Sequence, residues 1–307
     1  MAIHALRDYN MMGNDGMMTK DKLWLNKSSQ QNTVAIIGNG FDICHGLPSR
    51  YSCFKEWLKE HNEPLLKILD EYVDVSGEWW NEFESSLSKF NVSKLIANAP
   101  KYYPPRNSSP LPEFSYPESD FFRSIREQIS KSFTEWARSL NCSSAKPLLR
   151  LPAARLYVSF NYTDTLEQLY DVSEREILYI HGKAARGDDL VFGHVKSPFD
   201  LEGETILGNA DSQLIEEISF LDKFPYTQIA KYKSTLLPAL TSANYIWVFG
   251  LSFSEEDYEY IEWISMKNRR LSWIVSWHTE LDKRRILATF DRAGVTDYEL
   301  FYSISSF

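Results

Sequence analysis

The residues of this sequence that are best suited to chemistry come directly after apolar segments. Asn161 follows Arg155–Phe160, and His181 follows Glu176–Ile180. A histidine has an unperturbed pKa of about 6.5, so it can accept or donate a proton near neutral pH. An asparagine amide can hold a water molecule or a sugar hydroxyl in position. These two residues are the candidate catalytic pair, although a histidine that ends an apolar strand is also typical of a hydrogen-bonded core.

A turn with two glycines forms a candidate ligand-binding segment. Gly38, Asn39 and Gly40 follow the apolar run Thr33–Ile37, and Asp42 comes two residues later. Backbone N–H groups at a strand-to-helix turn attract anions, and glycine lets the backbone approach a phosphate closely. We therefore predict a phosphate cradle, with Asp42 as acceptor for a ribose hydroxyl. The alternatives are that the glycines only end a strand and that Asp42 only caps a helix.

Two more polar segments complete the candidate set. Asp164 follows Asn161 closely, and Gly250 and Ser252 follow the apolar segment Asn244–Phe249. Ligands of open α/β sheets bind at the carboxyl ends of strands, where these residues are expected to lie. The alternative is that Thr163 or Asp164 only caps the next helix.

Two ionisable residues have no assigned role. His194 follows Phe192-Gly193 and shares the ambiguity of His181. Glu84 lies one helical turn after Trp80, so it either faces water or reaches a cleft between a helical segment and the sheet.

Composition narrows the classes of function. The chain of 307 residues has 33 Lys and Arg against 42 Asp and Glu, a formal charge of −9. Such an acidic chain is a poor candidate for nucleic-acid binding. It has neither an HExxH motif nor a metal-spaced His/Cys cluster, so we expect no metal. Three cysteines without a CxxC pair and the lack of an apolar run of about 18 residues predict a cytoplasmic protein without a membrane span.

The elements that position these residues alternate between strands and helices. This alternation predicts an α/β, Rossmann-like parallel sheet flanked by helices. The expected strands are 33–37, 155–160, 176–180, 190–192, 244–249, 271–277 and 298–302. The expected helices of the second half are 164–171, 222–239, 254–267 and 280–292. We interpret residues 1–30 as a flexible tail and 31–307 as a single domain with a helical insertion at about 51–150.

Six segments of the chain resemble the bacteriophage abortive-infection AbiH family. They are I-I-G-N-G-F-D-I-C-H-G-L-P (36–48), W-N-E-F-E-S-S-L (80–87), S-F-N-Y-T-D-T-L-E (159–167), I-H-G (180–182), F-G-H (192–194) and G-L-S-F-S-E-E-D-Y-E-Y (250–260). The resemblance implies an antiviral defence protein. One departure is Leu251, where many members are expected to have histidine.

The same segments are distantly similar to sirtuins. The sirtuin loop G-A-G-x-S-x-x-x-G-I-P has the spacing of residues 38–48, and its catalytic asparagine and histidine match Asn161 and His181. This likeness implies a sirtuin-like fold that binds NAD. Two departures are Asp42, in place of a serine, and Thr163, where the sirtuin pattern has aspartate.

The resemblance therefore implies hydrolysis of the nicotinamide–ribose bond of NAD, which depletes NAD during infection, with no cofactor beyond this substrate. One alternative is a nucleotide-sensing module that binds without catalysis and signals through a partner. A third hypothesis is a metal-dependent phosphoesterase or nuclease that uses Asp42, Asp164 and His181. The expected ligand is a small nucleotide, and the expected macromolecular partner is a second copy of the chain or another protein of a defence system.

Overall fold

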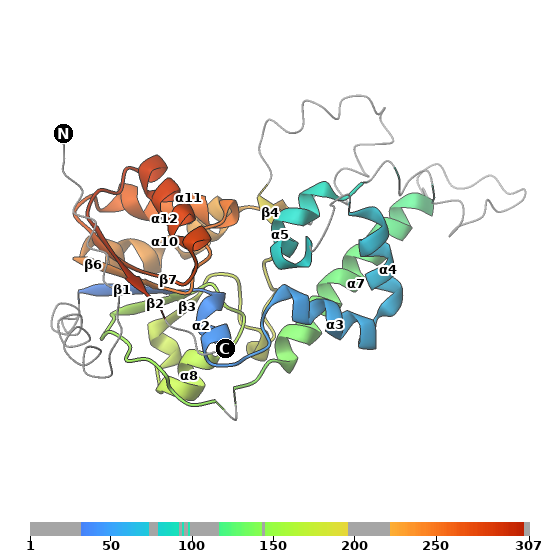
Figure 1. The fold of residues 1–307 in the computed structure, drawn as a ribbon, viewed down its shortest axis with the longest axis horizontal. Helices are drawn as coiled ribbons and strands as arrows, with labels where there is room; N and C mark the ends of the chain where they lie inside the picture. Colours follow the sequence, from blue (N-terminus) through green and yellow to red (C-terminus); the bar gives the residue numbers. More distant parts are fainter. Residues whose placement is uncertain are drawn as a thin grey trace, which may run out of the picture.

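A six-stranded parallel sheet forms the core of one half of the molecule, on the left in Figure 1. The structure, a computed structural model, describes residues 32–73, 79–91, 94, 98, 117–142, 145–195 and 222–303. The predicted tail at 1–30 lies outside these residues. The strands are β1 (Thr33–Ile37), β2 (Leu156–Ser159), β3 (Ile177–Tyr179), β6 (Tyr245–Phe249), β7 (Ser272–Trp277) and β8 (Tyr298–Tyr302).

The order of the strands reverses once, next to β1. The sheet runs β3-β2-β1-β6-β7-β8, and all neighbouring strands are parallel. Counted along the chain, this is the order 3-2-1-4-5-6 of dinucleotide-binding folds, whose ligands bind where the order reverses. The prediction of a Rossmann-like α/β fold is confirmed, and the crevice of such a fold falls between the carboxyl ends of β1 and β6.

Helices cover both faces of the sheet. α10 (Pro225–Thr241), α11 (Glu255–Lys267) and α12 (Glu280–Ala293) pack on one face, where Val34 and Ile36 join their apolar side chains. α2 (Asn39–Cys44) and α8 (Thr165–Tyr170) lie on the other face, with Ala35 and Ile37. Because β1 is buried on both sides, its sequence is an unbroken apolar run.

The helices between β1 and β2 form a second group with its own apolar core. They are α3 (Tyr51–His61), α4 (Glu63–Tyr72), α5 (Phe83–Ser86) and α7 (Pro117–Ser139), with 3₁₀ turns at Trp79–Glu82 and Leu87–Lys89. Their core is rich in aromatic side chains and includes Phe54, Trp80 and Phe133. This group lies beside the sheet, and α5 packs against α11 (Figure 1). It falls within the predicted helical insertion, whose boundaries stay a prediction.

One predicted strand is wrong. Residues 190–192 form no strand, and β4 (His194–Val195) instead pairs with β5 (Asp222–Lys223) in a separate two-stranded sheet. The apolar run 190–192 has another partner, because Phe192 packs in the core of the helical group, with its ring centroid 4.3 Å from that of Phe133. A short apolar run does not reveal whether it pairs with a sheet or packs on a helix.

Three glycines join β1 to β6 at the point where the strand order reverses. The N–H groups of Gly38 and Gly40 donate hydrogen bonds to the carbonyls of Phe249 (2.9 Å) and Gly250 (2.8 Å). A Cβ on Gly250 would lie 2.4 Å from the nitrogen of Phe41, and Gly250 has φ of +69°. Side chains cannot occupy such a space, so this join requires glycine.

We expect Gly250→Ala to lower the free energy of unfolding by about 4 kcal/mol or more, because the new methyl group meets backbone that cannot yield. Gly46→Ala is the matched control, because Gly46 also has a positive φ (+81°) but nothing lies within 4 Å of its Cβ position. That control should lose only about 1–2 kcal/mol, from backbone strain alone. Urea unfolding of both variants measures the difference, and equal losses would show that the join is not tightly packed.

Candidate functional site

The most deeply buried polar group at the sheet edge is the carboxyl of Asp42, on α2. Asp42 is 1% exposed. Thr163, in the loop after β2, donates a 2.5 Å hydrogen bond from Oγ1 to Asp42 Oδ2, and Thr165 Oγ1 lies 3.1 Å behind it and donates to Thr163. The suggestion that Thr163 caps the next helix is therefore wrong, because its hydroxyl is turned toward Asp42.

Two oxygens in this buried cluster have no hydrogen-bond partner. They are Asp42 Oδ1 and Asn161 Oδ1, and Asn161 is only 5% exposed. A buried acceptor without a donor is costly, and such groups in native proteins call for a specific explanation, such as a bound water or a functional role. The cluster therefore presents two acceptors for a ligand rich in hydrogen-bond donors.

Burial raises the pKa of Asp42 from its ordinary value of 3.8 to about 6. Loss of hydration is the main cause, and the neighbouring polar side chains of Thr163, Thr165 and Asn161, which favour the charged form, oppose it. The nearby charge of Asp164 adds to the increase. A carboxyl in this condition changes its charge close to neutral pH, which is a property typical of functional sites.

His181 lies at the end of the neighbouring strand, β3. Ser159 and Tyr179 are register partners, so Asn161 and His181 each follow that pair by two residues. The ring of His181 is 2% exposed, and its Nε2 lies 3.2 Å from the hydroxyl of Tyr260. The two candidate catalytic residues thus come from one edge of the sheet but differ in their surroundings: Asn161 lies beside Asp42, and His181 lies among aromatic rings.

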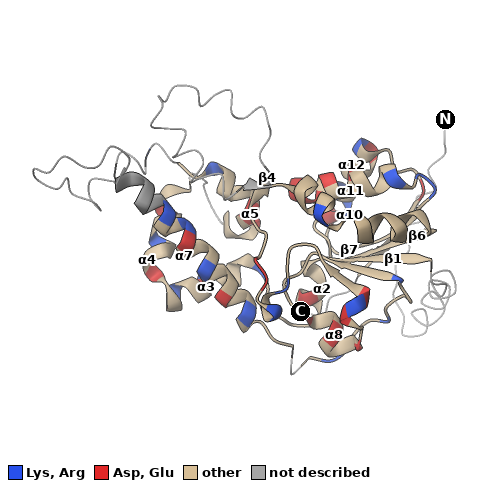
Figure 2. Ribbon diagram, turned by 180° about the vertical axis from the view of Figure 1, so that it is seen from behind, with Lys and Arg blue, Asp and Glu red and all other residues tan. Residues whose placement is uncertain are grey.

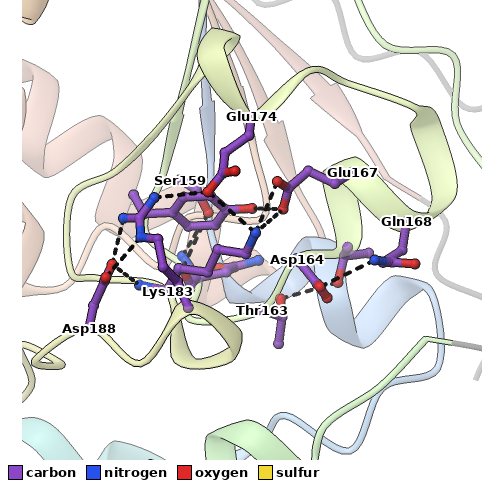
Figure 3. Close-up of polar contacts among 12 residues, drawn as sticks. Ser159, Thr163, Asp164, Glu167, Gln168, Glu174, Lys183 and Asp188 are labelled. Carbon is purple, nitrogen blue, oxygen red and sulfur yellow. Dashed lines mark hydrogen bonds and ion pairs between the residues drawn. The ribbon is translucent and has the colours of Figure 1, made fainter.

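An ion-pair network fixes the loop that carries His181 (Figure 3). Lys183 is 9% exposed, and its Nζ lies 2.9 Å from Glu167 and 3.6 Å from Glu174. The hydroxyl of Tyr179 donates to the same Glu167 (2.7 Å), and Asp188 accepts the N–H of Lys183 (2.9 Å). These contacts tie the turn after β3 to α8, so the backbone of His181 is held from both sides.

The turn at Gly38–Gly40 has another role than the predicted phosphate cradle. The N–H groups of Gly38 and Gly40 bond to the β6 turn, so these two donors do not face a ligand. The Asn39 amide donates to the carbonyl of Ser49 at 2.8 Å. The glycines permit the close packing of two turns. Because the N–H groups of Gly38 and Gly40 already have partners, they do not support the predicted phosphate cradle.

The other two candidates, Ser252 and Asp164, lie near the same edge of the sheet but contact different helices. Ser252 donates from Oγ to Asp257 Oδ2 at 2.6 Å, in the first turn of α11. Asp164 occupies the N-cap position of α8 without making a cap hydrogen bond, and its carboxylate accepts from the Gln168 amide at 3.3 Å. Ser252 is exposed and bonds to the first turn of α11, whereas Asp164 is half-buried and contacts α8 (Figure 3).

Three tyrosines near Glu84 and His181 are not among the predicted site residues. The hydroxyl of Tyr51 donates to Glu84 Oε1, and Tyr162 and Tyr260 flank the ring of His181. With 14% aromatic residues in the chain, these tyrosines give no signal that separates them from the core. His194 is 9% exposed, and its strand β4 packs against α5 and α11, which places it near the same junction.

Comparison with known proteins identifies a family. The family model described as "Bacteriophage abortive infection AbiH" matches residues 34–277, which contain every candidate site residue. No curated protein matches the chain. Across the part of the chain that the structure describes, no helix is long and apolar enough to cross a membrane, and no three His, Cys, Asp or Glu side chains form a group that could hold a metal ion.

We expect the free energy of unfolding to fall as the pH rises from about 4 to about 6. The folded state holds the proton of Asp42 up to a pKa of about 6, whereas the unfolded chain releases it near 3.8, so ionisation disfavours the fold. A shift of about two pKa units corresponds to about 3 kcal/mol. Asp42→Asn should remove this loss and be more stable than the unsubstituted chain at pH 7.

Urea unfolding between pH 4 and pH 8 measures this effect. Asp291→Asn, at an exposed position on α12, is the matched control and should keep the pH dependence of the unsubstituted chain. An unchanged pH dependence in Asp42→Asn would contradict the buried-carboxyl assignment.

Proposed function

The chain belongs to the bacteriophage abortive-infection family AbiH, and from this premise we propose that it acts in defence by hydrolysing the nicotinamide–ribose bond of NAD. The observation that carries the proposal is the pair of buried acceptors without partners, Asp42 Oδ1 and Asn161 Oδ1. They lie at the carboxyl edge of a sheet with the strand order of dinucleotide-binding folds. The two hydroxyls of a ribose are donors that suit two adjacent acceptors.

The proposed reaction breaks the bond between the ribose C1′ and the nicotinamide nitrogen. The electron pair of that bond leaves with nicotinamide, and the ribose becomes an oxocarbenium-like cation. The Asp42 carboxylate, in a buried site, stabilises this positive charge. Water then attacks C1′ and loses a proton, so the products are nicotinamide, ADP-ribose and H⁺.

Asn161 and His181 have separate roles in this scheme. The Asn161 amide holds the attacking water or a ribose hydroxyl, so its role is to position a reacting group. His181 takes up the released proton through the ribose hydroxyls, as a general base. The ion-pair network of Lys183 supports this role, because it fixes the turn that carries the imidazole.

A second candidate function is a nucleotide sensor that binds NAD without cleaving it. The observation that favours it is the enclosure of His181, whose ring lies among Phe160, Tyr162 and Tyr260 and is 2% exposed. A sensor would show NAD-dependent stabilisation on melting without release of nicotinamide.

We expect the purified chain to release nicotinamide from NAD, and His181→Ala and Asn161→Ala to lower kcat about 100-fold or more, in the range of lost acid–base and positioning groups. Chromatographic detection of nicotinamide and ADP-ribose measures the rates. His61→Ala and Asn141→Ala, at exposed positions, are the matched controls and should keep full activity.

Equal turnover by the unsubstituted chain and all four variants would contradict the assignment of His181 and Asn161. Stabilisation by NAD without any product would favour the sensor. Loss of activity on chelation would instead support the metal-dependent phosphoesterase hypothesis.

A further inference from the structure

A second polar group lies between the helical group and the sheet, next to His181. We call it the tyrosine–carboxylate cluster and define it by Tyr51, Glu84, Tyr162, Asp257 and Tyr260. Its members come from three places in the fold: α3 and α5, the loop after β2, and the first half of α11. Acidic residues, red in Figure 2, occupy the first turns of α5 and α11, and β4 contacts both helices.

One hydrogen bond joins two members of the cluster, and the rings of two of its tyrosines lie beside His181. Tyr51 donates its hydroxyl hydrogen bond to Glu84, and the Tyr51 ring packs 5.2 Å from that of Phe83. Tyr162 donates to the carbonyl of Val191 at 2.9 Å. The ring centroids of Tyr162 and Tyr260 lie 6.3 Å and 5.6 Å from that of His181. The rings of Tyr162 and Tyr260 thus flank the histidine, and the Tyr51–Glu84 pair belongs to the adjoining helical group.

The electrostatic character of this cluster is negative. Burial raises the pKa of Tyr51 and of Tyr162 well above the usual value, and the charge of Glu84 raises both further. Asp257 and Glu84 act in the same direction on the pKa of Tyr260. The three phenols therefore stay neutral, and the negative charge of the cluster lies on the carboxylates of Glu84 and Asp257.

Part of the cluster is accessible. Tyr51, Glu84 and Tyr162 are half-buried, whereas Tyr260 and Asp257 are 1% and 5% exposed. The first three are surrounded closely enough by protein to desolvate the phenols, yet they keep part of their surface open. Tyr162 is also the sequence neighbour of Asn161.

From these contacts we propose that the tyrosine–carboxylate cluster binds the positively charged pyridinium ring of the substrate. The inference rests on the proposed function, in which the ribose lies against Asp42 and Asn161. A flat cation is attracted both to aromatic faces and to carboxylates, and the attraction is stronger when the cation is desolvated. The cluster selects oxidised NAD, because the dihydronicotinamide of NADH is neutral.

The chemistry of the other parts of NAD favours this assignment. Phosphates are anions that Glu84 and Asp257 would repel, and adenine is neutral and gains nothing from their charge. Cleavage also converts the bound pyridinium to neutral nicotinamide, so the attraction is lost with the bond. The same cluster therefore holds the substrate and releases the product.

The test is calorimetric titration of the full chain with 1-methylnicotinamide, a pyridinium cation without a glycosidic bond, and with neutral nicotinamide. We expect the cation to bind at least about tenfold more tightly, which is about 1.4 kcal/mol. Glu84→Gln should remove this preference and leave the affinity for nicotinamide within about twofold. Glu82→Gln, an exposed residue of the preceding turn that pairs with Arg285, is the matched control and should keep the preference.

Tyr51→Phe provides a second variant, because it removes the hydroxyl that holds Glu84 and keeps the ring. This variant should bind 1-methylnicotinamide more weakly. If Glu84→Gln does not fold, the titration of Tyr51→Phe tests the inference instead. Equal affinities for cation and neutral ring, or a preference that survives both substitutions, would overturn the inference.

Nicotinamide release from NAD, measured in parallel, separates this inference from the proposed function. Release of nicotinamide without a preference for the cation refutes the inference and leaves hydrolysis standing. A preference that depends on Glu84 without release of nicotinamide refutes hydrolysis and leaves the pyridinium site standing.

Discussion

The close approach of two backbone turns is the constraint on which the rest of the structure depends. Gly38 and Gly40, after β1, bond to the turn after β6, and Gly250 leaves no room there for a side chain. This join occurs where the strand order reverses, which is where an open α/β sheet presents its ligand crevice. Because the turn is fixed by its neighbour, α2 begins at Asn39 and carries Asp42 into the interior. The glycines thus serve the site by packing, and the polar groups that face a ligand come from the residues that this packing positions.

The buried polar groups at this edge work against stability. An ionised carboxyl at 1% exposure is disfavoured, and the partner-less oxygens of Asp42 and Asn161 add to the cost. The fold tolerates them because the surrounding elements are held firmly: the Lys183 network fixes the turn after β3, and apolar cores cover both faces of the sheet. Such a combination of rigid support and locally unfavourable groups is typical of functional sites, where stability and activity have opposing requirements.

The helical group contributes to the site as well as to the fold. Its aromatic core packs against Tyr162 and Phe192, and Tyr162 joins it to the sheet edge because its ring also lies beside that of His181. Glu84 and Tyr51 belong to this group, whereas Asp257 and Tyr260 belong to α11. In the proposed scheme, the sheet edge holds the ribose and the junction with the helical group holds the pyridinium, so both parts of the fold meet at the bond that breaks.

The sequence by itself determined the strand-helix alternation, the parallel sheet, the family and the importance of the strand ends, because apolar periodicity and short motifs are local properties of a chain. It also placed Asn161 and His181 at the ends of two predicted strands, and the structure showed that these strands are neighbours. It did not determine that the N–H groups of Gly38 and Gly40 hydrogen-bond to the turn after β6. Nor did it determine that Phe192 packs in a helical core, or that Tyr51 and Glu84 approach α11. Those facts depend on contacts between residues far apart in the chain, and no local pattern distinguishes a tyrosine that packs from one that lines a site. Only the tertiary structure decided which polar groups lost their water without gaining a partner, because burial is a property of the assembled layers.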